Sequence, residues 1–454
     1  MPAGVRTQSL PSRWDWRELG KVTPIRNQGD CGSCYAFAGI AGFESRLLIE
    51  GAGAYDLSEN NAKECNWEEL NNYVEPGWGP VGSCSGGSAS MLANLFSQKG
   101  VVLESCDSYV DQDVECRTTC SYQKTLLDWR LISANVVPDP NVVKGYIQTY
   151  GPVHANMYIG DGDAWEDEFG NYDGSYTLYH PGTETTNHHV LIVGWDDNLA
   201  HAGGRGGWIV KNSWGTNWGG TCGYGSERGY FTIAYGSASI GMYSSVIHSW
   251  QDYDPSGGLM HYDEAYWLES YGYNSTTGWG LCRFLPTRNT DVTRVEFWTS
   301  DVTTDVDVYI YDSFDGSRLS SLLWSRQNLS FSEAGYHGVQ VDPRLAVTSG
   351  NDVVAVVKFT NSSYRYPIPI DDVGPSENQR TYVSASGNNG SWYELGQQNA
   401  DVAIRLRTSD TVATPTATRT ATRTATQTRT PTPTSTYTRT PAPTHAPTSL
   451  VTPT

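Results

Sequence analysis

The sequence has few positive charges, few methionines and no long apolar run. Its 454 residues contain 30 Lys and Arg against 49 Asp and Glu, a formal net charge of −19. This acidity argues against nucleic acid as a partner, because phosphate recognition needs a basic surface. No apolar run is long enough to span a bilayer, so we expect no transmembrane segment. The first residues, MPAGVRTQSLPSRWDW, also lack the apolar core of a signal peptide.

Cysteine is present in a distinctive pattern. Seven of the 9 cysteines lie before residue 121, and only 5 methionines accompany them. Such clustering in a region rich in Gly, Asn and Ser is typical of an oxidising compartment. We therefore predict a secreted or cell-surface protein whose export signal has been removed. Because the count is odd, at least one thiol stays free or pairs with another molecule.

The C-terminal part of the chain divides into two regions. Residues 409–454 are almost entirely Thr, Pro, Ala and Arg, a composition that buries too little apolar surface to fold. We predict a disordered linker or stalk there, with hydroxyls available for O-linked sugars. Residues 250–408 read as an all-β sandwich, because short alternating segments rich in Val, Tyr and Phe are separated by turn residues. These segments are 291–300, 304–313, 336–342, 351–360 and 400–408.

The N-terminal region, residues 1–249, has a mixed pattern. Apolar residues at helical spacing predict helices over 34–50 and 86–100. Strand-like segments follow at 188–197, 206–214 and 229–236. Helices come first and strands later, which predicts an α+β domain with two segregated halves.

The stretch NQGDCGSCYAFAG places Cys31 three residues before Cys34. A structural zinc site needs two close pairs of ligands, and neither Cys65 nor Cys84 has a cysteine two to four residues away. A redox pair is typical of a βαβ context, which this region does not show. In a third interpretation, Cys31 forms a disulfide and Cys34 is a free thiol. The helix that follows would then lower the pKa of Cys34.

A nucleophilic thiol needs an imidazole and a group that orients it. His188 in NHHV and Asn212 in KNSWG follow Cys34 at the wide spacing typical of one class of cysteine nucleophile. The motif CGSCY resembles the signature of papain-like and cathepsin-like cysteine peptidases. The stretches CSGG, NHHVLIVGW and KNSWGTNWG follow in the order of that family, so the resemblance covers nearly all of residues 11–249.

The resemblance implies a papain-like fold of two lobes, one helical and one a β-barrel. It also implies roles for individual residues. Cys34 would be the nucleophile and His188 its base and acid. Asn212 would hold the imidazole, Trp214 would shield that hydrogen bond, and Gln28 would help to form the oxyanion hole. The substrate cleft would include Gly86, Gly87, Ser88, Ala89, Asn187 and Trp214. No metal or cofactor is implied.

Two positions depart from the family pattern. Tyr35 follows the nucleophile where Trp is usual, and His189 follows the base where Ala is usual. We expect His188 to be the catalytic histidine, with His189 on the opposite face of the strand. His154 we interpret as structural.

The resemblance also implies disulfides. The implied pairs are Cys31 with Cys84, Cys65 with Cys116, and Cys106 with Cys120. Cys222 and Cys282 remain, and the sequence leaves their pairing open; a bond between them would link the two domains and leave Cys34 as the one free thiol.

The segment after residue 249 resembles the lectin-like domain of bacterial surface peptidases. Its Tyr and Trp residues suggest a cell-surface glycan as a partner. The acidic loop 161–174 is expected to be solvated, with calcium binding or a preference for basic substrates as alternatives.

The sequence thus predicts a monomeric secreted or cell-surface endopeptidase with a polypeptide substrate. Two alternatives remain. One is an adhesin or glycan-binding protein with an inactive peptidase scaffold. The other is an amidase or transpeptidase that acts on cell-wall peptides.

Overall fold

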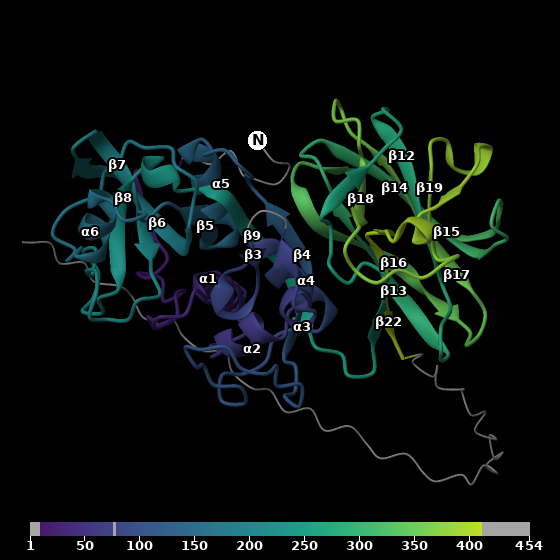
Figure 1. The fold of residues 1–454 in the computed structure, drawn as a ribbon, viewed down its shortest axis with the longest axis horizontal. Coiled ribbons are helices and arrows are strands. Elements are labelled where there is room, and N and C mark those ends of the chain that lie inside the picture. Colours follow the sequence, from purple (N-terminus) through teal and green to yellow (C-terminus); the bar gives the residue numbers. More distant parts are fainter. Residues whose placement is uncertain (1–9, 76–78, 411–454) are drawn as a thin grey trace, which may run out of the picture. The chain divides into compact units, whose positions relative to one another are not determined.

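Strands dominate the fold that the computed structural model describes, over residues 10–75 and 79–410 (Figure 1). The predicted stalk lies, except for its first two residues, outside this range. The helices are α1 (Cys34–Ile49), α2 (Glu59–Glu64), α3 (Trp67–Leu70), α4 (Ala89–Gln98), α5 (Pro140–Tyr150) and α6 (Ala164–Gly170). The strands up to residue 252 are β1 (Arg13–Asp15), β2 (Val74–Glu75), β3 (Gly79–Pro80), β4 (Lys124–Leu131), β5 (Val153–Met157), β6 (His188–His201), β7 (Gly204–Lys211), β8 (Tyr230–Ala234) and β9 (Met242–Asp252).

The helices and strands predicted for the N-terminal region are present as α1, α4, β6, β7 and β8. Helix α1 is buried along most of its length and packs closely on α4. A Cβ added at Gly39 would lie 2.3 Å from Leu92 Cδ1, so any larger residue there would force the Leu92 side chain to move. The predicted order is only partly correct, because α5 and α6 lie between strands. Helix α6 also occupies much of the acidic loop, where Asp163 caps it by accepting from the backbone N–H of Glu166.

Residues 258–409 form an all-β sandwich, as predicted. Its strands are β10 (Gly258–Met260), β11 (Glu269–Tyr271), β12 (Thr277–Phe284), β13 (Thr290–Thr299), β14 (Thr304–Phe314), β15 (Leu319–Phe331), β16 (Ala334–Val347), β17 (Val353–Thr360), β18 (Ile368–Asp371), β19 (Thr381–Ser384), β20 (Tyr393–Glu394), β21 (Asp401–Val402) and β22 (Ile404–Ser409). One sheet has the order β15-β14-β17-β12-β19-β20. Its inner face packs on β13, β16 and β22 through a fully buried core that includes Val306, Phe297 and Val341.

A single sheet crosses from the N-terminal region into this sandwich. Its order is β10-β22-β13-β16-β4-β9-β5-β6-β7-β8, and β16 pairs antiparallel with β4 through Gly335↔Arg130 and Tyr336↔Trp129. The fully buried Arg405 binds Asp263 and also donates to Asn94 Oδ1 on α4 at 2.6 Å. All described residues accordingly belong to one compact unit.

Candidate active site

The site lies where the first residue of α1 meets the first residues of β6. Cys34 opens α1 and is 8% exposed. The backbone groups of His189, Tyr35 and Cys34 lie close enough to the thiol to act on its pKa. Because His189 is the second residue of β6, the sulfur lies against the start of that strand.

His188 and Asn212 are brought together by the pairing of β6 with β7. Their strands are in register through Leu191↔Lys211, and Asn212 directly follows β7. His188 Nε2 donates to Asn212 Oδ1 at 2.8 Å, and both residues are buried. An imidazole that donates through Nε2 leaves Nδ1 as the acceptor in its neutral form. The ring of Trp214 lies 5.2 Å from the ring of His188.

The electrostatics differ from the prediction. Burial raises the pKa of the Cys34 thiol to about 11, although the nearby backbone N–H groups act in the opposite direction. Burial lowers the pKa of His188 to about 4, and its hydrogen bond to Asn212 acts against this. The expected low thiol pKa is therefore wrong for the resting site, because loss of water outweighs the helix dipole.

Gln28 connects both sides of the site. Its amide Nε2 donates to Cys31 O at 2.8 Å, and its Oε1 accepts from Ser213 Oγ at 2.5 Å. Its backbone N–H donates to Ser213 O at 2.8 Å. The buried amide is thus fixed beside the loop that leads into Cys34.

The rim of the cleft is the segment from Gly86 to Ala89. Gly86 has φ +101°, and a Cβ there would meet nothing within 4 Å, so its side faces open space. A Cβ at Gly87 would lie 2.7 Å from the ring of Tyr35. Ser88 caps α4 by accepting from the backbone N–H of Met91 at 3.1 Å, and Ala89 begins the helix.

Asn187 is exposed, but its side chain holds a neighbouring loop. Its Oδ1 accepts from the backbone N–H of Ile159 at 2.9 Å, and its Nδ2 donates to Gly160 O at 2.6 Å. Its own backbone N–H donates to Met157 O. Any contact with substrate would therefore come from its carbonyl oxygen.

The structure contains disulfides between Cys31 and Cys84, Cys65 and Cys116, and Cys106 and Cys120. Cys222 and Cys282, whose pairing the sequence left open, are both free. Cys282 is buried in the sandwich core, whereas Cys222 is half-buried beside Arg17 in the N-terminal region. Cys34 is therefore one of three free thiols.

Sequence reasoning missed a pair of histidines beside the nucleophile. His154 Nε2 lies 2.9 Å from His189 Nδ1. Each was interpreted alone as structural, and only the pairing of β5 with β6 brings them together. The one available signal was a histidine at 189 where the family has alanine.

This geometry agrees with a comparison against protein families. The model described as papain family cysteine protease matches residues 10–250, more than half of the chain. The chain belongs to the papain family of cysteine proteases. A second model, the lectin-like domain, matches residues 259–408.

Cysteine proteinases and cathepsins of other organisms are similar to about half of this chain. Cysteine proteinase 1 of Entamoeba histolytica is 31% identical over 244 residues, which cover 52% of this chain and 68% of that protein. Cathepsin J of Rattus norvegicus is 32% identical over 215 residues, 46% of this chain and 58% of that protein. The peptidase is therefore a hydrolase, a cysteine endopeptidase. The adhesin and amidase alternatives are not favoured.

A solved structure matches the fold over most of the chain. The clostridial cysteine protease Cwp84 after propeptide cleavage gives a TM-score of 0.71 at 20% identity, over 88% of this chain and 100% of that one. A second structure, of the cysteine protease and lectin-like domains of Cwp84, gives 0.70 at 19% identity, over 90% and 91%. At this identity the likeness concerns the fold, a papain-like region followed by a lectin-like sandwich.

The following two absences concern residues 10–75 and 79–410 of the chain. None of the helices there is long and apolar enough to cross a membrane. No group of three or more His, Cys, Asp or Glu side chains in this part of the chain is arranged to hold a metal ion. The calcium alternative for the loop 161–174 thus gains no support.

Proposed function

We propose that the peptidase cleaves peptide bonds through Cys34, His188, Asn212 and Gln28. We place the domain boundaries at 1–249 for the catalytic domain, 250–408 for the lectin-like domain and 409–454 for the linker. The observation that supports these roles best is the hydrogen bond from His188 to Asn212 at 2.8 Å. It leaves Nδ1 of His188 as the base on the strand whose next residue contacts the sulfur.

The proposed reaction begins with proton transfer from Cys34 Sγ to His188 Nδ1, as the sulfur attacks the substrate carbonyl carbon. The oxyanion accepts from the backbone N–H of Cys34 and from the Nε2–H of Gln28 that Cys31 does not use. The intermediate collapses, the C–N bond breaks, and His188 gives its proton to the leaving amine. Water, deprotonated by His188, then attacks the thioester. The C–S bond breaks, and His188 returns the proton to the thiolate.

Burial explains why the proton moves within the site. A lone thiolate or a lone imidazolium is disfavoured there, as the pKa directions of Cys34 and His188 show. Transfer between them creates both charges together, so each stabilises the other. Trp214, packed on His188, keeps water from the bond to Asn212.

Labelling with an epoxysuccinyl thiol reagent, followed by mass spectrometry, tests this assignment. We expect one adduct, on Cys34, together with complete loss of cleavage of a denatured protein. Cys34→Ala should lose both. Cys222→Ala is the matched control, because Cys222 is the free thiol with partial exposure, and it should keep both. An adduct on another residue that abolishes cleavage would contradict the proposal.

We further propose that the protein is secreted or held at a cell surface and acts as a monomer. Three disulfides support an oxidising compartment. The similar protein Cwp84 is described as surface layer associated.

A glycan is the proposed second partner, on the outer face of the β14–β17–β12 strands. The rings of Trp279 and Tyr309 stack there at 5.8 Å. Lys358 lies over Trp279 and pairs with Asp307. Beside them is a hollow of about 200 Å³ lined by Asp305, Val306, Asp307, Asn328, Ser330, Lys358 and Thr360. Aromatic faces next to carboxylate, amide and hydroxyl groups suit a sugar ring and its hydroxyls.

Binding of the full chain to arrayed glycans, after inactivation with the epoxysuccinyl reagent, tests this second proposal. Trp279→Ala should weaken binding at least tenfold. Tyr364→Ala removes an exposed tyrosine elsewhere and should leave binding unchanged. No binding by the unmodified sequence would exclude a glycan partner, and equal binding by Trp279→Ala would exclude this face.

A further inference from the structure

One tyrosine of the lectin-like region lies beside the rim of the substrate cleft. Tyr266 belongs to the segment between β10 and β11, within the residues that the lectin-like model matches. It is 5% exposed, and its hydroxyl donates to Glu68 Oε1 on α3 at 2.8 Å. The hydroxyls of Ser88 and Ser90 lie close enough to the Tyr266 hydroxyl to act on its pKa. The second region therefore places a buried polar group next to Ser88, a residue of the rim.

Ser88 joins the rim to helix α4. Its Oγ accepts from the backbone N–H of Met91 at 3.1 Å and lies 3.0 Å from Ser90 Oγ. A capping residue fixes the path by which the chain enters its helix. Groups that hold the Ser88 side chain therefore also hold the path from the rim into α4.

The backbone of Tyr266 has a conformation that is unfavourable for a bulky residue. Its φ is +64°, in the left-handed region. Such a conformation persists where its surroundings impose it, and it is most frequent at functional sites. Here the neighbours are fixed, because Asp263 binds the buried Arg405 and the backbone N–H of Ala265 donates to Asp371 Oδ2 at 2.7 Å. The turn thus brings the hydroxyl of Tyr266 to the peptidase at the cost of local strain.

The same segment also binds further along α4. Asn94 Nδ2 donates to the backbone oxygen of Glu264 at 2.7 Å, and Gln98 Nε2 donates to that oxygen at 3.2 Å. Helix α4 therefore cannot move relative to the sandwich without losing several hydrogen bonds.

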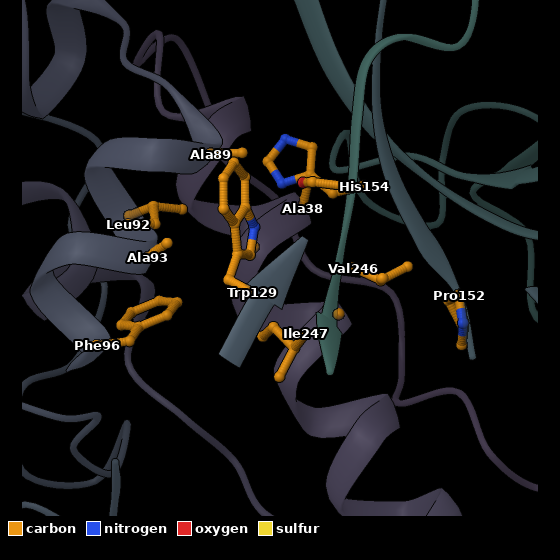
Figure 2. Close-up of a pocket in the computed structure, with 13 residues that line it drawn as sticks. Ala38, Ala89, Leu92, Ala93, Phe96, Trp129, Pro152, His154, Val246 and Ile247 are labelled. Carbon is orange, nitrogen blue, oxygen red and sulfur yellow. The ribbon is translucent and has the colours of Figure 1, made fainter. Parts of the chain in front are cut away.

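The opposite contacts of α4 leave little room for movement. Figure 2 shows Ala89 and Leu92 facing the indole of Trp129 on β4. The hollow between them is about 20 Å³, enough for about one water molecule. Trp129 lies edge-on to Trp298 of the sandwich at 6.0 Å, and Trp298 lies 5.7 Å from the ring of Tyr266. The start of α4 is thus enclosed by residues that the lectin-like region supports.

We propose that Tyr266 is a positioning residue for the peptidase, whose hydroxyl holds Ser88 and the rim in the form that binds substrate. The lectin-like region then completes the substrate cleft of the region before it. This inference rests on the proposed function, because it assumes that peptides bind along the rim beside Cys34. Tyr266 acts through Ser88 and touches no reacting atom. Its loss should weaken the binding of substrate and transition state equally, which raises KM and leaves kcat unchanged.

The experiment compares the full-length protein with Tyr266→Phe and Tyr262→Phe. The first variant keeps the ring and loses only the hydroxyl. Tyr262 is the matched control, because it lies in the same segment and its partly buried hydroxyl donates to Arg283 O, inside the sandwich, at 3.0 Å. Values of kcat and KM are measured with peptides that extend on the acyl side of the scissile bond. Titration with the epoxysuccinyl reagent gives the concentration of active sites.

Tyr266→Phe should raise KM by about threefold to tenfold, the usual effect of one hydrogen bond, without a change in kcat. Tyr262→Phe should match the unmodified protein. A loss of stability alone would lower the concentration of active sites and leave KM unchanged. The separation of KM from kcat therefore distinguishes positioning from a general structural role.

A double variant tests whether the effect passes through Ser88. Ser88→Ala removes the rim hydroxyl and should raise KM by itself. Adding Tyr266→Phe to it should then cause no further rise, because the two residues act through one contact. If the two changes multiply, Tyr266 does not act through Ser88 and the inference fails.

Two other results would overturn the inference. One is an unchanged KM in Tyr266→Phe, and the other is an equal rise in Tyr262→Phe. If Tyr266→Phe does not fold, Glu68→Ala, which removes the acceptor of the same hydrogen bond, decides by the same comparison of KM. Absence of both cleavage and Cys34 labelling in the unmodified protein would overturn the proposed function, and this inference with it.

Discussion

The two sides of the active site are built in different ways. The cysteine side, residues 28–120, carries Cys34 and consists of short helices and turns joined by three disulfides. The histidine side, residues 153–234, carries His188 at the start of β6 and Asn212 directly after β7, within strands β5 to β8, which pair continuously. One side is held by covalent links, and the other by backbone pairing.

The burial of polar groups explains this difference. Helix α2 is fully buried although its sequence is ENNAKE, so it adds little apolar stabilisation. Several of its charged and amide groups form specific bonds, such as the one that Asn60 Nδ2 donates to Asp107 Oδ1. The histidine side packs instead on fully buried Ile192, Trp195 and Phe231. On the cysteine side, cross-links add to an apolar core that includes Phe43 and Leu92.

The largest effect should come from removing the base on the histidine side. His188→Ala should lower kcat/KM by about 10⁴-fold or more, because no other group there accepts the thiol proton. Peptide cleavage measures this, and His201→Ala serves as the control. A loss below tenfold would mean that His188 is not the base.

Gln28 hydrogen-bonds to Cys31 on one side of the site and to Ser213 on the other. Its substitution should therefore have the next largest effect. Gln28→Ala should lower kcat by about 10²–10³-fold, the usual effect of one oxyanion donor. Ser213→Ala, which removes only the hydroxyl bonded to Gln28, should cost less. Equal losses in the two variants would indicate a positioning role rather than donation to the oxyanion.

Disulfide removal tests the cysteine side directly. By loop length, opening Cys31–Cys84 should cost about 4 kcal/mol of unfolding free energy, and opening Cys106–Cys120 about 3 kcal/mol. The sequence separations are 53 and 14. Denaturant unfolding of the paired Cys→Ser variants measures both. Opening Cys31–Cys84 should also reduce cleavage, because this disulfide joins the loop before Cys34 to the rim of the cleft. Equal activity in the two variants would argue against this link.

The pH dependence should report on His188. Its pKa near 4 lies below the ordinary value, so the base stays neutral until the pH falls to about 4. Activity should then fall about tenfold for each further pH unit, which corresponds to about 1.4 kcal/mol. Below the ordinary pKa the unfolded chain binds the proton more readily, so stability falls in the same direction. Initial rates measure the loss of activity at each pH, and fluorescence measured in parallel shows whether the protein is still folded, so the two effects can be separated. An acid limb near 6.5 would contradict the burial argument.

The smallest effect should come from trimming the apolar core of the histidine side. Ile192→Val should cost about 1 kcal/mol of unfolding free energy, because one buried methylene is lost. Cleavage by the folded protein should not change. Denaturant unfolding and kcat/KM at low temperature measure the two quantities. A marked change in kcat/KM would mean that the sheet core also sets the catalytic geometry.

The sequence was informative where a pattern is local. The helix that begins at Cys34 follows from its periodicity, and the order of the motifs identified the papain-like region and its lectin-like neighbour. Non-local features were missed. The pKa of Cys34 depends on burial by segments far along the chain. His154 and His189 meet only through strand register. The free state of Cys222 and Cys282 depends on where each lies in the fold, which counting cysteines cannot show.

The sheet that passes from β4 into β16 has a consequence for cooperativity. Unfolding of the sandwich would remove β16, the hydrogen-bonded neighbour of β4, and would leave Asn94 on α4 without its buried partner Arg405. Unfolding of the peptidase region would remove the same hydrogen bond from Arg405. Neither region has a complete interior alone, so the two should unfold in one calorimetric transition rather than two. A substitution that destabilises the sandwich would then also lower the fraction of molecules whose catalytic site is folded and active.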